Sequence, residues 1–280
     1  MEKFALIGFG EAGSTFARAG GWKTRATVYD VKADDPADGA AMLAAYADAG
    51  VTGAADLARV LSGAELVFSL VTADQAQAVA QAAAAHILPG TLYCDMNSVA
   101  PDTKQAAARA IETAGGHYVD VAVMAPVNPG RLAVPLLLSG PRAPDALAKL
   151  TALGFTNARV VGDQVGRAST IKMLRSVMYK GVEALTAECL LACEKAGVTD
   201  EVLGSFGNDW STGADYRLDR MMVHGLRRSA EMAEVVKTLE ALGVEPLMTR
   251  GTVTRQREIG SLAVRPVPAT LDEKLERLTR

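Results

Sequence analysis

The sequence has few of the residues on which disulfide-bonded and metal-binding proteins depend. Among its 280 residues are three cysteines, three histidines and only 5% aromatic residues. An odd number of cysteines does not suggest a disulfide framework. The histidines are scattered, without the spacing of metal ligands or of a nucleophile and its base. We therefore expect no metal site, and the cysteine usage favours a reducing, cytoplasmic compartment.

Long apolar runs and an excess of positive charge are also missing. No run reaches the roughly 18 apolar residues of a membrane span, so we expect no membrane partner. A formal net charge of −3 leaves no basic surface for nucleic acid. The first residues enter a strand-like run directly, without the pattern of a secretion signal. The length predicts two domains with sizeable cores.

Six residues near the N-terminus carry the clearest functional pattern, and they are Gly8, Phe9, Gly10, Glu11, Ala12 and Gly13. They follow the apolar run 4–7 and precede the helix-like segment 14–19. Gly8 permits the tight turn and Gly10 the close approach of phosphates, whereas Gly13 lets the helix pack on the strand. Strand, G-x-G-x-x-G and helix together predict a dinucleotide site, with the pyrophosphate at the helix N-terminus.

An acidic residue supports the same prediction. Asp30 ends the strand-like segment 26–30, about 20 positions after the middle glycine, where a carboxylate binds the adenosine ribose hydroxyls. A carboxylate there repels a 2′-phosphate. Asp34 and Asp35 add to the repulsion, and Lys32 opposes it. We therefore expect NAD as the cofactor, with NADP the less favoured alternative.

Residues 1–163 alternate between strand-like and helix-like segments, which predicts a doubly wound, mostly parallel Rossmann sheet. The helix-like segments are 39–49 and 75–86. The expected strands are 5–7, 26–29, 66–70, 91–94, 118–123 and 136–138. The residues that end the third of these, Leu70, Val71 and Thr72, are expected to contact the adenosine half of the cofactor, since ligands bind at the carboxyl ends of such strands.

Residues 164–280 change in character and predict an all-α domain. The segment 168–195 lacks proline and is long enough for one helix of roughly 40 Å, which would join the two domains. A further helix is expected over 229–242, capped by Ser229 and ended by Gly243. The segment 211–215 is expected to be a turn between helices.

The long helix carries a polar stripe in an otherwise apolar segment. Lys172, Ser176, Lys180 and Glu183 fall within an arc of about 80°. The apolar residues Ile171, Leu174, Met178, Leu185 and Cys189 recur at helical spacing, so the helix is expected to be largely buried. The stripe must then face solvent, a partner or a cleft.

The chain resembles the β-hydroxyacid dehydrogenases, which include 3-hydroxyisobutyrate and 6-phosphogluconate dehydrogenases. The resemblance covers roughly residues 1–190 and rests on Gly8–Gly13, Asp95–Pro101, Asp120–Val123, and Gly166 with Lys172. The segments 172–183 and 227–232 look most like a branch whose C-terminal domain has been treated as uncharacterised. Family members generally form dimers through the helical domain, so the resemblance implies a homodimer.

The resemblance also implies roles for individual residues. Lys172 would be the catalytic acid or base, because a lysine in a dry cleft beside other cations has a lowered pKa and can accept the hydroxyl proton. Lys180 would add positive charge near the substrate. Asn97 and Ser98, which follow a strand, would lie beside the nicotinamide ribose and the substrate. Asp120 is interpreted as a structural strand-end residue.

Two positions depart from the family pattern. Ser176 stands where the family usually has asparagine, so a shorter side chain without the amide fork is left there. Val123 leads into Met124 at the substrate segment, where the family usually has serine. Met124 removes a hydroxyl and adds an adaptable apolar surface. The substrate is therefore expected to be bulkier or less acidic than hydroxyisobutyrate.

The sequence thus predicts a cytoplasmic NAD-dependent dehydrogenase that acts on a small or medium hydroxy acid or a related alcohol. One alternative is an imine reductase of the same architecture, although enzymes of that kind usually lack the lysine. The other is a non-catalytic NAD-binding sensor, against which Lys172 and Asn97 argue.

Overall fold

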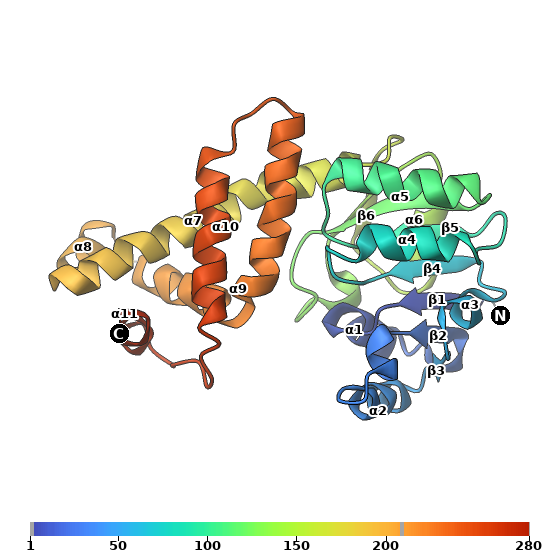
Figure 1. Cartoon of the computed structure of the whole chain (residues 1–280), viewed down its shortest axis with the longest axis horizontal. Helices are drawn as coiled ribbons and strands as arrows, with labels where there is room; N and C mark the ends of the chain where they lie inside the picture. Colours follow the sequence, from blue (N-terminus) through green and yellow to red (C-terminus); the bar gives the residue numbers. More distant parts are fainter. Residues whose placement is uncertain (1–2, 208–209, 280) are drawn as a thin grey trace. The chain divides into compact units, whose positions relative to one another are not determined.

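The computed structural model describes residues 3–207 and 210–279, and the chain divides into two compact units, Met1–Lys172 and Met173–Arg280 (Figure 1). The first unit is a Rossmann-type α/β domain and the second is all-helical, so the predicted fold class is confirmed. The units divide inside the long helix, whereas the sequence placed the domain boundary at 163/164, before that helix.

The first unit contains a single eight-stranded sheet in the described part of the chain. The order is β3-β2-β1-β4-β5-β6-β7-β8, and all neighbours are parallel except β6 and β7. The strands are β1 Phe4–Ile7, β2 Ala26–Tyr29, β3 Thr52–Gly53, β4 Leu66–Ser69, β5 Leu92–Asp95, β6 His117–Val123, β7 Leu136–Ser139 and β8 Ala158–Gly162. Six of them match the expected strands, whereas β3 and β8 were missed.

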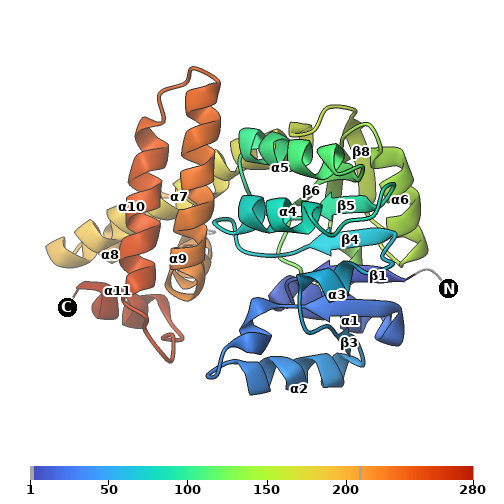
Figure 2. The ribbon, with the colours of Figure 1, turned by 45° about the vertical axis from the view of Figure 1, so that its right-hand side comes forward.

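Helices cover both faces of this sheet. They are α1 Glu11–Gly20, α2 Gly39–Ala49, α3 Leu57–Leu61, α4 Ala76–Ala84, α5 Pro101–Thr113 and α6 Ala143–Ala152, with short 3-10 turns at Lys23–Arg25, Val31–Asp34 and Arg131–Ala133. Alternate strand residues point to opposite faces. One face packs on α1, α2 and α6, and the other on α3, α4 and α5. Figure 2 shows α4 and α5 side by side over their face.

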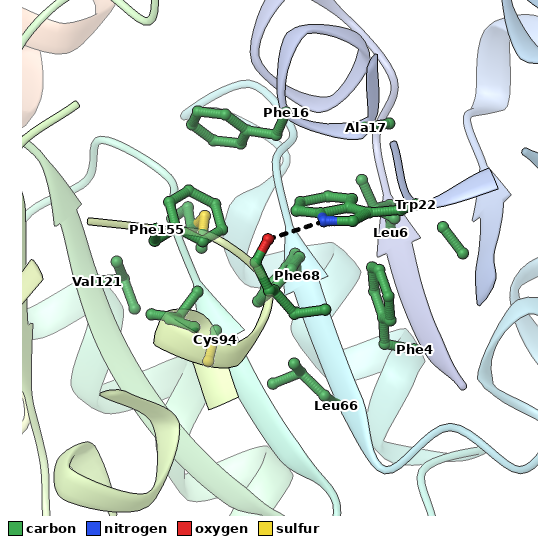
Figure 3. Packing of buried hydrophobic residues seen from close by; sticks show 14 of the residues in the cluster. Phe4, Leu6, Phe16, Ala17, Trp22, Leu66, Phe68, Cys94, Val121 and Phe155 are labelled. Carbon is green, nitrogen blue, oxygen red and sulfur yellow. Dashed lines mark hydrogen bonds between the residues drawn. The ribbon is translucent and has the colours of Figure 1, made fainter. Parts of the chain in front are cut away.

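An aromatic cluster fills the core beneath α1 (Figure 3). The Trp22 ring meets Phe4 edge-on, with ring centroids 5.0 Å apart. Its indole Nε1 donates a hydrogen bond to the Leu153 carbonyl oxygen at 3.1 Å. Phe155 packs edge-on against Phe16 of α1. These contacts hold the helix that follows the glycine motif against the sheet.

The long helix α7 runs from Arg167 to Ala196, close to the predicted 168–195. The other helices of the second unit are α8 Thr199–Ser205, α9 Trp210–Ala241, α10 Leu247–Ser261 and α11 Leu271–Thr279. Helices α9 and α10 pack so closely at Gly225 that a Cβ on this residue would lie 2.4 Å from the Gln256 carbonyl oxygen. Among the described residues, no helix is both long and apolar enough to cross a membrane.

Two expectations for the helical unit were wrong. The segment 211–215 lies within α9 and is not a turn. Ser229 lies inside the same helix, 3% exposed, and does not cap a helix start. The helix ends at Ala241, just before Gly243 as expected. Burial of Ala214 and Leu218 against the unit's core explains why the helix continues through the small polar residues.

The apolar residues of α7 that were expected to be buried are largely exposed, whereas the polar stripe, which could face solvent, a partner or a cleft, lies mostly against other helices of the unit. The polar residues Ser176, Lys180 and Glu183 are at most 8% exposed, whereas Leu174 and Met178 are 41% and 66% exposed. Lys180 and Glu183 are buried because partners on α9 and α10 satisfy their charges. Side chains that looked like a core face therefore lie at the surface.

Candidate cofactor and catalytic site

The glycine turn between β1 and α1 has the shape of a phosphate cradle. A Cβ on Gly8, whose φ is +93°, would lie 2.5 Å from the Leu70 carbonyl oxygen, and one on Gly13 would lie 2.6 Å from the Gly8 oxygen. A Cβ on Gly10 would meet no atom of the described residues within 4 Å. Packing thus requires Gly8 and Gly13, while Gly10 borders open space at the start of α1. No described side chain caps that start, so the helix N-terminus can receive an anion.

Asp30 ties this turn to the end of β2. Its Oδ2 accepts a hydrogen bond from the Phe9 backbone nitrogen at 2.7 Å, and its Oδ1 accepts one from the Lys32 nitrogen at 3.0 Å. A carboxylate oxygen has lone pairs for further donors. Asp34, which accepts a hydrogen bond from the Tyr29 hydroxyl at 2.8 Å, adds a second negative charge just beyond β2.

The carboxyl ends of β4 and β5 bring further predicted residues to the same sheet edge. Leu70 adjoins the glycine turn through its nitrogen, which donates to the Ile7 oxygen at 2.8 Å, and Val71 and Thr72 follow it. Asn97 Nδ2 donates to Ser69 Oγ at 3.0 Å. Within the described residues, Asn97 Oδ1 and Ser98 Oγ are buried and lack a hydrogen-bond partner. Such acceptors fit hydroxyl or amide donors of a ligand.

The segment after β6 lies beside the start of α7. Met124 packs against a small apolar cluster that contains Ala122, Leu137 and Ala168. Its nitrogen donates to the Pro135 oxygen at 2.9 Å. Val123 and Met124 are both partly exposed. The substrate segment named from the sequence therefore shares its surroundings with the first turn of the helix that carries Lys172.

Side chains of β6 and β7 anchor the first turn of α7. Ser139 Oγ accepts a hydrogen bond from the Ala168 nitrogen at 3.0 Å. Asp120 accepts two from Ser169, at 2.9 Å from the nitrogen and 2.7 Å from the hydroxyl. Lys172 follows in the next turn, partly exposed and still within the first unit. Asp120, interpreted as structural, is fully buried and caps this helix.

Two predicted substrate residues belong to the second unit. Lys180 Nζ lies 2.5 Å from Glu231 Oε2, and Arg227 lies 2.6 Å from the other oxygen of that carboxylate. Glu231 therefore neutralises the charge of Lys180, which was expected to add positive charge near the substrate. Ser176, at the position of the family asparagine, is 8% exposed.

A second buried charge group lies farther along α7. Glu183 accepts hydrogen bonds from Arg228 at 2.6 Å and from Gln256 at 2.9 Å. Burial raises the pKa of Glu183, although the Arg228 charge opposes the shift. Burial also lowers the pKa of Arg228.

Comparison with known proteins agrees with this geometry. Residues 3–140 match the NAD binding domain of 6-phosphogluconate dehydrogenase, and residues 194–259 match a domain of unknown function, DUF1932. A conserved hypothetical protein from Sinorhizobium meliloti is 39% identical, with a TM-score of 0.76 over 100% of this chain and 96% of that one. The protein belongs to the β-hydroxyacid dehydrogenase superfamily.

Two further solved structures show how far the likeness extends. A conserved protein of unknown function, described as structurally similar to 3-hydroxyacid dehydrogenases, is 30% identical, with a TM-score of 0.68 over 92% of this chain and 97% of that one. The 3-hydroxyisobutyrate dehydrogenase of Mycobacterium tuberculosis is 15% identical, with a TM-score of 0.72 over the full length of both chains. At that identity the likeness concerns the fold. The first unit is thus an NAD(P)-binding domain.

Sequence reasoning missed the buried polar residues beneath the site, which are Ser69, Asp95, Lys104, Ser139 and Ser169. Asp95 ends an apolar strand, and a charge at such a position was a usable signal. Lys104 lies in a polar helix segment and gave no signal of its own.

Proposed function

We propose that the protein is an NAD-dependent oxidoreductase that transfers hydride between the nicotinamide and a small or medium hydroxy acid or related alcohol. The observation that carries this proposal is the open cradle at Gly10, with Asp30 bonded to the same turn. Lys172, in the second turn of a helix anchored to the same sheet, supplies a group for proton transfer.

The proposed chemistry divides between the cofactor and the chain. Bound NAD⁺ would accept the hydride from the carbinol carbon. Lys172, as the neutral amine, takes the hydroxyl proton as the C=O bond forms. In the reverse direction its ammonium polarises the carbonyl and returns the proton. The unpartnered Asn97 Oδ1 is suited to accept a hydrogen bond from a hydroxyl and so orient it.

The substrate is proposed to be bulkier or less acidic than hydroxyisobutyrate. Met124 offers thioether surface where the family usually has a serine hydroxyl. The pairing of Lys180 with Glu231 supports the same proposal, because a neutralised lysine attracts an anion weakly.

Cofactor titrations test the proposed cradle. We expect Gly10→Ala to weaken NADH binding about tenfold or more, because the new Cβ fills space that the phosphates need, at a stability cost of at most about 1 kcal/mol. Gly8→Ala serves as the comparison for stability, because it acts on the fold rather than on the space for the phosphates. Its Cβ clashes with the Leu70 backbone at a strained φ, so it destabilises the fold by about 1–3 kcal/mol. Unchanged NADH affinity in Gly10→Ala contradicts the cradle.

The choice between NAD and NADP is tested at Asp30. Wild-type protein should bind NADH more tightly than NADPH, and Asp30→Ala should reduce the difference by weakening NADH binding. Asp34→Ala removes only the second charge and leaves the carboxylate on the turn in place, so it should reduce the difference less than Asp30→Ala does. Tighter binding of NADPH by the wild-type protein would overturn the assignment.

A substrate panel tests the reaction. We expect NAD⁺-dependent oxidation of at least one 3-hydroxy acid or related alcohol, followed through NADH absorbance. The panel includes 3-hydroxyisobutyrate, L-serine and larger 3-hydroxy acids, with 1-pyrroline as an imine to be reduced by NADH. Turnover of 1-pyrroline alone would mean that the protein is an imine reductase and not a dehydrogenase. NADH binding without any turnover would favour a sensor.

A further inference from the structure

We propose that Lys104, Asp120 and Ser169 are positioning residues, which hold the helix of Lys172 and the turn of Asn97 in one buried frame of hydrogen bonds and ion pairs. The proposal rests on the proposed function, since it concerns the placement of the two groups to which that function assigns the proton transfer and the orientation of the hydroxyl.

The frame begins at α7. Asp120 binds both the backbone nitrogen and the hydroxyl of Ser169, and it also accepts a hydrogen bond from Ser139 Oγ at 3.1 Å. Ser139 in turn binds the Ala168 nitrogen. Asp120, Ser139 and Ser169 are at most 2% exposed. Two N–H groups at the start of α7, which no helix can satisfy internally, are thus bound by side chains of the sheet.

Lys104 of α5 connects this cap with the end of β5. Its Nζ lies 3.4 Å from Asp120 Oδ1 and 3.0 Å from Asp95 Oδ1. The same nitrogen donates to the Asp95 carbonyl oxygen at 2.7 Å. Asp95 and Asp120 are neighbours in the β5–β6 register, so one ammonium can bind both carboxylates. The Lys104 side chain is fully buried, where an unpaired charge would be costly.

The frame ends at Asn97. Asp95 Oδ1, the oxygen that binds Lys104, also accepts a hydrogen bond from the Asn97 backbone nitrogen at 2.9 Å. Asp95 Oδ2 accepts one from the Tyr118 hydroxyl at 2.6 Å. Burial and the Asp95 charge raise the pKa of Tyr118 well above its usual value, so the hydroxyl keeps the proton that it donates. The Asn97 side chain is then oriented by Ser69.

A continuous chain of polar contacts therefore runs from Ser169 through Asp120, Lys104 and Asp95 to Asn97. In a site without water, such contacts are strong and have little freedom to rearrange. Proton transfer depends steeply on distance, and a displacement of 1 Å can cost about 100-fold in rate. A frame of this kind is suited to hold an acid–base group and a hydroxyl-binding group in a fixed position relative to each other.

The test removes one hydroxyl at the α7 end. Ser169→Ala deletes the 2.7 Å bond to Asp120 and leaves the backbone bond possible. Thr170→Ala is the matched control, because the Thr170 hydroxyl binds only the Gly166 oxygen among the bonds identified, within its own helix turn. Both variants lose one hydroxyl from the same turn, but only the first breaks the frame.

Hydrogen–deuterium exchange gives a readout that needs no substrate. We expect the amides of residues 167–172 to exchange about tenfold faster or more in Ser169→Ala, with exchange in Thr170→Ala near that of the wild type. Equal exchange in Ser169→Ala and the wild type, or an equal increase in both variants, would overturn the proposal.

Kinetics with the fastest substrate of the panel give the second readout. We expect Ser169→Ala to lower kcat about tenfold or more, while KM and the NADH dissociation constant stay within about twofold. Unchanged kcat, or a loss equal to that of Thr170→Ala, would contradict positioning. Lys172→Met, assayed in parallel, separates the two proposals. If it remains active the proposed function fails, whereas an inactive Lys172→Met beside a fully active Ser169→Ala rejects only the frame.

Discussion

The two units of this protein both bury charged side chains, but they do so in different ways. In the first unit, Lys104 lies between two carboxylates whose oxygens also accept hydrogen bonds from hydroxyls and backbone nitrogens. In the second unit, Glu183 binds Arg228 and Gln256, yet within the described residues Arg228 Nε and Gln256 Oε1 are buried without a partner.

The difference concerns what each network connects. The network of the first unit joins strand ends and helix starts, where short side chains reach backbone groups that need partners. The network of the second unit joins three long helices whose own backbones are already satisfied. In the first case the charged groups all have partners, as in a frame that must hold one geometry, while Asn97 Oδ1 is left open for a ligand. In the second case, the open hydrogen-bonding atoms of Arg228 and Gln256 match helix packing, in which a buried pair is weak evidence for stability.

The largest expected effect comes from Lys104→Met. The change leaves Asp95 and Asp120 as buried carboxylates without their shared cation. The free energy of unfolding, measured by urea denaturation, should therefore fall by about 3–5 kcal/mol. Lys149→Met is the control, because Lys149 lies 3.7 Å from Glu65 in a more exposed pair and its loss should cost under about 1 kcal/mol. Equal losses in the two variants would show that the first network adds no special stability.

Arg228→Met should lower the free energy of unfolding somewhat less, by about 3 kcal/mol, because it leaves one buried carboxylate without its cation rather than two. Loss of the cation raises the pKa of Glu183 further above its unfolded value. Such a group favours folding at low pH, so the deficit should be smaller in acid than at neutral pH. Adding Glu183→Gln should restore much of the stability, since the amide keeps a partner for Gln256. If stability does not recover, the second network requires its charged pair as the first one does.

The smallest effect on stability is expected on the exposed apolar side of α7. Met178 and Leu185 are 66% and 58% exposed, and they support the proposal that the helical unit forms a homodimer. Met178→Glu should change stability by less than about 0.5 kcal/mol while shifting the protein toward monomer in analytical ultracentrifugation. The exposed Leu43 of the first unit provides the control, and Leu43→Glu should leave the mass unchanged. A monomeric wild-type protein would contradict this proposal.

Local patterns were sufficient to predict most of the first unit. Buried strands such as β1 and β4 are short apolar runs bounded by turns, and 39–49 was predicted with the bounds of α2. The missed strands lie at the sheet edges. β3 has two exposed residues, and β8 is a mixed segment without full burial, so neither has the apolar signature of a central strand.

The helical unit was harder to predict because tertiary packing overrides local pattern there. The small polar residues before Tyr216 are typical of a turn, but burial of Ala214 and Leu218 keeps them helical. The stripe on α7 was recognised, whereas the burial of Lys180 depends on Glu231, about fifty positions away. Burial of a charge is decided by its partner, which spacing along one helix does not reveal.

The same limit applied to the candidate site. Gly8–Gly13 and Asp30 follow a spacing that a single βαβ unit imposes, so they could be found in the sequence. The contact of Lys104 with both carboxylates depends on the register of β5 against β6. Nothing in the local sequence specifies that register.

Proton transfer by Lys172 is the step on which the proposed hydride exchange at the NAD site depends. Its most direct test is the single-turnover rate of NADH formation in wild-type protein and in Lys172→Met, each saturated with NAD⁺ and the best alcohol of the panel. The rate should be at least about 1,000-fold slower in the variant, with NADH affinity within about twofold. A variant rate within threefold of the wild type would contradict proton transfer by Lys172.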